Sequence, residues 1–170
     1  VGIWMRHGRP GMEADDRFNY LTDTKGMQAM FDNAIQIVEK FKDHPAVLTW
    51  GIGNEVYLNM ETDDEKKAYS TLLERICRKI KSLDSNHPIT SVEAWTFGIK
   101  WWQEYVPSID IYGINVYGEG AKVIPAELEK LSVEKPYLIT EFGVRGEWDQ
   151  PKDTNGVIIE PTDQEKYKTI

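Results

Sequence analysis

The sequence predicts an α/β fold, more specifically a partial (β/α)8 barrel of the TIM-barrel type with about five parallel strands and their helices. Two observations support this prediction. Apolar strand-like runs alternate with amphipathic helical segments along the 170 residues, and two of those runs end on a glutamate, at Glu55 and at Glu141. Such alternation is typical of a parallel sheet with right-handed crossovers, and (β/α)8 barrels carry their chemistry where the strands end.

The first predicted elements are a short strand and a long amphipathic helix. Residues 2–5 are apolar and predict a strand, whereas residues 6–23 have no regular period and predict a loop. Thr24 can cap a helix that continues to about residue 42. Pro45 ends this helix, because the residue before a proline disfavours the helical conformation. The helix would bury one apolar face, made of Met27, Met30, Phe31, Ala34, Ile37, Val38 and Phe41.

The second predicted strand leads into the first candidate catalytic residue. Residues 47–52 are almost entirely apolar, as expected of a strand that is covered on both faces. Gly51 and Gly53 would allow other groups to approach this strand closely. Asn54 and Glu55 follow at the point where the strand ends.

The remaining elements continue the alternation. Thr62 and Glu65 have capping-box spacing and begin a second long helix, which the turn at residues 84–88 ends. Pro125 is expected to open a short helix over residues 126–131. Strands are expected over 89–95, 109–117 and 136–141, a helix over 97–105, a loop over 144–161, and a last helix after Thr162 or Asp163.

Two architectures fit this order of elements: a doubly wound open sheet and a (β/α)8 barrel. An open-sheet nucleotide-binding fold would show a glycine-rich turn after its first strand. The segment 6–11 does not have the GxGxxG pattern, and no GxxxxGK[ST] motif occurs. Asn54, Glu55, Tyr117 and Glu141 fall at strand ends, which favours the barrel. Because a complete barrel has typically about 250 residues, we expect one partial catalytic domain over residues 1–170, with roughly the third to seventh strands.

The composition is typical of a globular protein, with 41% apolar and 28% charged residues. The net charge of −8 argues against a nucleic acid or an anionic membrane surface as a partner. No stretch approaches about 18 consecutive apolar residues, and the N-terminus lacks the basic segment of a signal peptide. The three histidines do not have metal-ligand spacing. We therefore predict no catalytic metal, no cofactor, no nucleic-acid partner and no membrane partner.

Two motifs resemble the active-site strands of a known group of enzymes: HPAVLTWGIGNEV, which ends at Val56, and KPYLITEFG, which ends at Gly143. They look like strands of the clan A retaining glycoside hydrolases, nearest to family 2-type (β/α)8 catalytic domains, which include β-glucanases and β-glycosidases. The segments KDHPAV, IDIYGINVYG and IEPTDQEKY extend the resemblance over nearly the whole chain. The resemblance implies a retaining hydrolase of β-linked oligo- or polysaccharides, and a secreted or periplasmic parent protein.

By this resemblance, Glu55 is the general acid/base and Glu141 is the nucleophile. A retaining mechanism needs two carboxyl groups roughly 5–5.5 Å apart, one protonated and one ionised. Two carboxyl groups at such a distance cannot both ionise easily, so their environments divide the two roles. The resemblance also assigns Asn54 to the 2-hydroxyl of the sugar and Tyr117 to a hydrogen bond with the nucleophile.

Other residues are candidates for sugar binding because of their positions. Asn115 would point to the same side as the tyrosine two residues later, by the strand period of two. Trp95 and Trp148 each follow a strand, where a flat ring is placed to stack on a sugar. Arg6 and His7 end the first strand and are either cleft residues or loop anchors.

A second interpretation stays open, namely a catalytically silent carbohydrate-binding or structural barrel piece. The presence of both Glu55 and Glu141 favours an enzyme, because a non-catalytic domain has no chemical reason to hold the pair. The arginine of the family's second strand and the aromatic residue of its eighth have no assigned counterpart here. A five-strand piece would leave two sheet edges unpaired. We expect further strands of the same barrel, or a second chain, to cover those edges.

Overall fold

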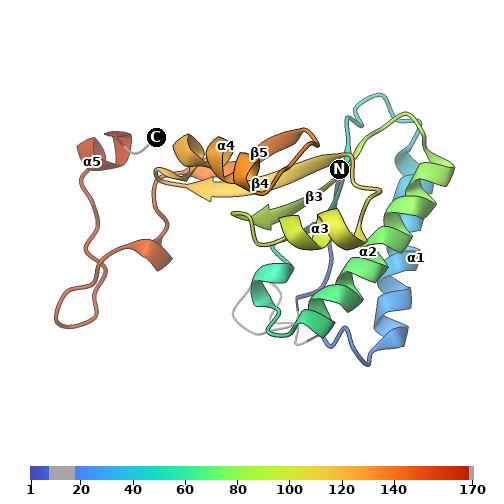
Figure 1. Cartoon of the computed structure of the whole chain (residues 1–170), viewed down its shortest axis with the longest axis horizontal. Helices are drawn as coiled ribbons and strands as arrows, with labels where there is room; N and C mark the ends of the chain where they lie inside the picture. The colour runs from blue at the N-terminus through green and yellow to red at the C-terminus, as the bar shows by residue number, and fades with distance from the viewer. Residues whose placement is uncertain (8–17, 169–170) are drawn as a thin grey trace.

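The computed structural model describes residues 1–7 and 18–168, and its centre is a five-stranded parallel sheet (Figure 1). The strands follow one another in chain order across the sheet, and each pairs in parallel with the next. This order confirms the predicted partial barrel with its five strands. They are β1 (Gly2–Ile3), β2 (Trp50–Asn54), β3 (Ile89–Ala94), β4 (Ile111–Tyr117) and β5 (Tyr137–Gly143).

Helices lie between the strands, as the alternation predicted. The long helices α1 and α2 pack side by side, and α3 packs against α2, while the C-terminal segment with α5 extends away from the sheet (Figure 1). The α-helices are α1 (Thr24–Phe41), α2 (Asp63–Leu83), α3 (Ile99–Tyr105), α4 (Gly120–Lys130) and α5 (Asp163–Lys168), and the short 3-10 helices are η1 (Tyr57–Asn59) and η2 (Glu147–Asp149).

The largest core lies between the sheet and these helices. Alternate side chains of the strands face the helices, because successive residues of a strand point to opposite faces. Fully buried members from the strands include Trp50, Ile52, Ile89 and Ile114, and the helices contribute Leu73, Ile76, Ile80 and Trp102. The opposite face of the sheet, which would be the barrel interior, carries the polar residues of the candidate site.

The start of the first helix differs from the prediction in its capping residue. The cap is Asp23, whose carboxylate accepts a 2.8 Å hydrogen bond from the backbone N–H of Gly26, and Thr24 is already the first helical residue. The predicted capping box of α2 is confirmed, with Thr62 and Glu65 bonded reciprocally. Residues 8–17 of the loop predicted over residues 6–23 lie outside the described residues.

Two other predicted boundaries were wrong. Strand β2 begins at Trp50 rather than at Val47, because Val47 closes a turn by donating to the carbonyl of His44, and Leu48 is 80% exposed. Helix α4 begins at Gly120, so that Pro125 lies inside it rather than at its start. The earlier start places the pair Ile124 and Leu128 on one buried face, four residues apart.

Strand β5 is the last strand of the described sheet and has a strand partner on one side within the described residues. Apolar side chains along it are exposed, among them Leu138 at 46% and Phe142 at 67%. Such an open apolar edge is the kind of edge that proteins normally cover. That further strands or another chain cover this edge stays a prediction.

Candidate active site

The polar residues of the candidate site gather at the carboxyl ends of β2, β4 and β5. Asn54 is the last residue of β2, and Glu55 follows it directly. Asn115 and Tyr117 lie near the end of β4, and Glu141 lies in β5, opposite Asn115 in the strand register. Because all five strands are parallel, these ends meet at the same edge of the sheet.

Two register shifts shape this edge. Between Gly51 and Asn54 the pairing of β2 with β3 shifts, and Gly53 has a φ of +73°. A side chain at Gly53 would place its Cβ 2.5 Å from the hydroxyl of Tyr69, so only glycine fits there without rearrangement. Glu55 itself has a φ of +53°, a left-handed conformation that is uncommon for a residue with a side chain. The strand end is therefore turned sharply at the residue that carries the first carboxylate.

The second shift lies in β5. Asn115 pairs with Glu141 while Ile114 pairs with Ile139, so Thr140 is an extra residue in this strand. A bulge of this kind redirects the side chains beside it. As a result, the consecutive residues Thr140 and Glu141 both line the cleft, although neighbours in a regular strand point to opposite faces.

Asn115 connects the two sides of the site. Its Nδ2 donates to Oε1 of Glu55 at 2.8 Å and to Oδ1 of Asn54 at 3.1 Å. Its Oδ1 accepts a 2.7 Å hydrogen bond from the hydroxyl of Thr140. Asn115 is only 3% exposed. A buried and fully bonded amide thus links the Glu55 strand end to the strand that carries Glu141.

Glu141 is bonded to the predicted tyrosine. The hydroxyl of Tyr117 donates to Oε2 of Glu141 at 2.7 Å, and this hydrogen bond, with desolvation and the charges of Glu141 and Glu55, raises the pKa of Tyr117 to about 12. The phenol therefore remains a donor at every pH at which a typical enzyme works. The ring of Trp148 lies edge-on to Tyr117, with centroids 5.3 Å apart. Trp148 is 74% exposed, so its ring borders the site from the solvent side.

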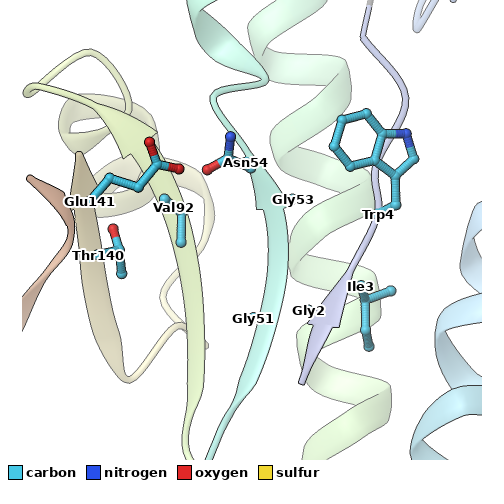
Figure 2. A pocket seen from close by; sticks show the side chains of 9 residues that line it. All are labelled: Gly2, Ile3, Trp4, Gly51, Gly53, Asn54, Val92, Thr140 and Glu141. Atoms are coloured by element: carbon cyan, nitrogen blue, oxygen red, sulfur yellow. The ribbon is translucent and has the colours of Figure 1, made fainter. Parts of the chain in front are cut away.

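A cleft of about 390 Å³ opens beside these groups. Figure 2 shows Asn54 and Glu141 turned toward each other, and Trp4 at a similar level beyond β2. Trp4 was not singled out from the sequence because the strand was predicted over residues 2–5, whereas β1 ends at Ile3 and leaves Trp4 directly after it. The lining residues are Gly2, Ile3, Trp4, Gly51, Gly53, Asn54, Val92, Thr140 and Glu141.

The other candidates from the sequence are placed differently. The guanidinium of Arg6 lies 4.8 Å from the centre of the Phe18 ring, and Arg6 accepts a hydrogen bond from Tyr20 at its carbonyl, which fits a loop anchor. His7 is buried and stacks on Trp4, so it supports a cleft residue. Trp95 has a φ of +49°, and its ring contacts the start of α4 at Gly120.

Among residues 1–7 and 18–168, no cluster of three or more His, Cys, Asp or Glu side chains is arranged to hold a metal ion. No helix in the same part of the chain is both long and apolar enough to cross a membrane.

The family model described as glycosyl hydrolases family 2, TIM barrel domain, matches residues 4–166. No curated protein sequence matches this chain.

Solved structures resemble the fold over most of this chain. A β-glucuronidase from Bacteroides uniformis matches with a TM-score of 0.62 and 19% identity, over 86% of this chain and 19% of that one. A β-galacturonidase from Eisenbergiella tayi, bound to galacturonate, matches with a TM-score of 0.56 and 21% identity, over 81% of this chain and 25% of that one. An exo-β-1,4-mannosidase from an Opitutaceae bacterium matches with a TM-score of 0.58 and 17% identity, over 84% of this chain and 31% of that one. The chain thus spans less than a third of the length of these proteins.

Proposed function

This chain belongs to glycosyl hydrolase family 2, and on that premise we propose that the complete protein hydrolyses β-linked glycosides with retention of configuration. In this proposal Glu55 is the general acid/base and Glu141 is the nucleophile. Asn54 binds a sugar hydroxyl, Asn115 holds Asn54 and Glu55 in place, and Trp148 and Trp4 offer apolar ring faces to the sugar from two sides.

One observation carries the proposal: the two glutamates are held at one sheet edge by different partners. Glu141 accepts a hydrogen bond from the Tyr117 hydroxyl, which orients its carboxyl group in the cleft for attack as a nucleophile. Glu55 accepts from the neutral amide of Asn115, which also holds Asn54. Two carboxyl groups in unlike environments at one site are the arrangement that a retaining glycosidase uses.

The reaction would proceed in two displacements. In the first, a carboxylate oxygen of Glu141 attacks the anomeric carbon, the glycosidic C–O bond breaks, and Glu55 gives its proton to the leaving oxygen. In the second, Glu55 takes a proton from water as the water oxygen attacks the anomeric carbon, and the bond to Glu141 breaks. Each step inverts the anomeric centre, so the product keeps the configuration of the substrate.

The sugar is proposed from the structural relatives. Their names describe hydrolases of β-linked glucuronic acid, galacturonic acid and mannose. A panel of 4-nitrophenyl β-glycosides of neutral sugars and uronic acids therefore covers the proposed substrate class, and the sugar with the highest kcat/KM defines the assay.

The test compares the complete protein with its Glu55→Ala and Glu141→Ala variants, and with Glu129→Gln on the exposed surface of α4 as a control. We expect Glu141→Ala to abolish turnover, and Glu55→Ala to lower it by roughly 10²–10⁴ for substrates that need acid assistance. The first sugar released, followed by proton NMR, should be the β-anomer. A first product with the α-configuration would exclude retention. Wild-type turnover in both alanine variants would show that other residues carry the reaction, and an absence of turnover in the wild-type protein itself would favour the catalytically silent carbohydrate-binding interpretation.

A further inference from the structure

Glu93 is a buried carboxyl group behind the candidate site. It lies on β3, is 1% exposed, and follows Val92, which lines the cleft. Because neighbours in a strand point to opposite faces, Glu93 faces the helices rather than the sugar site. No ion pair within the described residues involves Glu93. Its partners are backbone N–H groups instead.

Those partners belong to the turn that follows Glu55. Oε2 of Glu93 accepts a 2.7 Å hydrogen bond from the backbone N–H of Tyr57, the first residue of η1. Oε1 accepts a 2.9 Å hydrogen bond from the N–H of Ala94 in its own strand. The carboxyl group therefore ties the start of the turn to β3.

Strand β3 holds the segment around Glu55 on both sides. The backbone N–H of Glu55 donates to the carbonyl of Val92 at 3.0 Å, and the Glu93 bond to Tyr57 follows two residues later. Before Glu55, the hydroxyl of Ser91 donates to the carbonyl of Ile52 at 2.7 Å. Between these anchors Glu55 keeps its left-handed φ of +53°, a conformation that persists where the surroundings impose it.

We propose that Glu93 is a positioning residue for Glu55: by fixing the turn at Tyr57, it holds the Glu55 carboxyl where a leaving oxygen is protonated. This inference rests on the proposed acid/base role of Glu55. Glu93 does not touch the sugar, and its effect passes through the backbone between residues 55 and 57.

The residues packed around Glu93 hold its side chain in the position from which it bonds to Tyr57. Burial and, to a smaller extent, the charge of Glu55 raise the pKa of Glu93, the backbone N–H groups of Ala94 and Tyr57 lower it, and the resulting pKa is about 8. A side chain at Gly98 would place its Cβ 3.2 Å from Cγ of Glu93, so the side chain of Glu93 is packed closely from the α3 side. Tight packing leaves Glu93 little freedom to choose other partners.

The experiment uses the dependence of turnover on the leaving group. General-acid assistance matters most when the leaving oxygen is strongly basic and least when it is weakly basic. The complete protein and its Glu93→Ala and Glu93→Gln variants are assayed with phenyl, 4-nitrophenyl and 2,4-dinitrophenyl glycosides of the preferred sugar. The matched control is Glu74→Gln. Glu74 accepts hydrogen bonds from the backbone N–H and the hydroxyl of Ser108 at 3.0 and 2.9 Å. Ser108 precedes β4, so this pair lies at the end of the strands opposite to the candidate site.

We expect Glu93→Ala to lower kcat/KM for the phenyl glycoside by roughly tenfold to a hundredfold and for the dinitrophenyl glycoside by less than about threefold. Glu93→Gln keeps one acceptor oxygen and should lie between wild type and Glu93→Ala. Glu74→Gln should leave the ratio between the two substrates unchanged. An equal loss for all three substrates in both Glu93 variants would overturn the inference.

Two measurements distinguish a failure of the positioning role of Glu93 from a failure of the proposed function and from a loss of folding. If Glu55→Ala itself shows no dependence on the leaving group, the proposed function fails rather than the positioning role. If Glu93→Ala is poorly folded by circular dichroism, a Glu93→Met variant, which preserves the side-chain volume and has no oxygen acceptor, decides the question: an unchanged leaving-group dependence in that variant would contradict the role of Glu93.

Discussion

The hydroxyl of Tyr117 and Oε2 of Glu141 are joined by a 2.7 Å hydrogen bond between neighbouring strands. In the register of β4 and β5, Glu141 stands opposite Asn115 rather than Tyr117, so the bond runs diagonally across the pair. Tyr117 reaches the carboxylate because it lies two residues further along the same face of β4.

Replacing Tyr117 with phenylalanine tests this bond. A hydrogen bond to a charged group contributes about 1.5–3 kcal/mol, so Tyr117→Phe should lower kcat/KM roughly tenfold to a hundredfold. Tyr137→Phe, on the exposed part of β5, is the control and should have wild-type kinetics. Full activity in Tyr117→Phe would show that the hydroxyl does not support Glu141 during turnover.

Substitution of Asn115 should lower kcat/KM more than substitution of its partner Thr140. Asn115→Ala removes the bonds to Glu55, Asn54 and Thr140 together, whereas Thr140→Val removes one bond and keeps the side-chain shape. We expect kcat/KM to fall by roughly a hundredfold in Asn115→Ala and by less than about tenfold in Thr140→Val, in line with about 1 kcal/mol for each neutral hydrogen bond and more for a buried group left unpaired. The reverse order would mean that the amide does not bridge the site.

Asp84 should stabilise the fold without affecting catalysis. It is buried and accepts hydrogen bonds from Trp50 Nε1 at 2.8 Å and His87 Nδ1 at 2.7 Å, at the N-terminal ends of the strands. Burial alone would raise the pKa of Asp84, but the hydrogen bonds from Trp50, His87 and the backbone outweigh it and lower the pKa to about 2. Asp84→Asn should therefore reduce the free energy of unfolding at pH 7 by about 1–3 kcal/mol.

The same lowered pKa sets the pH dependence of this effect. The stabilisation is complete above the ordinary pKa of 3.8 and is lost as the pH falls toward about 2. Urea unfolding of the complete protein, followed by tryptophan fluorescence, should show the gap between wild type and Asp84→Asn closing over this range. Asp32→Asn, on the exposed face of α1, is the control. A gap that stays constant down to pH 2 would contradict the assignment.

The raised pKa of Glu93 predicts a pH dependence of folding stability with the opposite sign to that of Asp84. Its folded-state pKa of about 8 lies above the ordinary 4.5, so the native state holds a proton that the unfolded chain has released. Stability should fall by up to about 1.4 kcal/mol per pH unit between these values and then level off. The charge of Glu55 acts on Glu93, and the buried Tyr57 and Tyr69 stay protonated because burial raises the pKa of each. Glu93→Gln should remove this slope, and an unchanged slope would place the titration elsewhere.

Local patterns in the sequence predicted the order of elements. Apolar runs and amphipathic periods depend on neighbouring residues, so the five strands, their helices and the capping box at Thr62 and Glu65 could be recognised without the fold. Boundaries were less certain where tertiary contacts decide them. Leu48 is apolar but exposed, and α4 begins before Pro125 because Ile124 and Leu128 pack on the sheet.

By itself the sequence determined which residues are present: a glutamate directly after β2, another near the end of β5, and motifs that resemble those of a known family. Only the tertiary structure decided which groups meet. The bulge at Thr140, the left-handed turn at Glu55 and the buried contact of Glu93 with Tyr57 all depend on the register between strands that are distant in the chain. Register is set by how whole strands pack against one another, and no local pattern of residues encodes it alone.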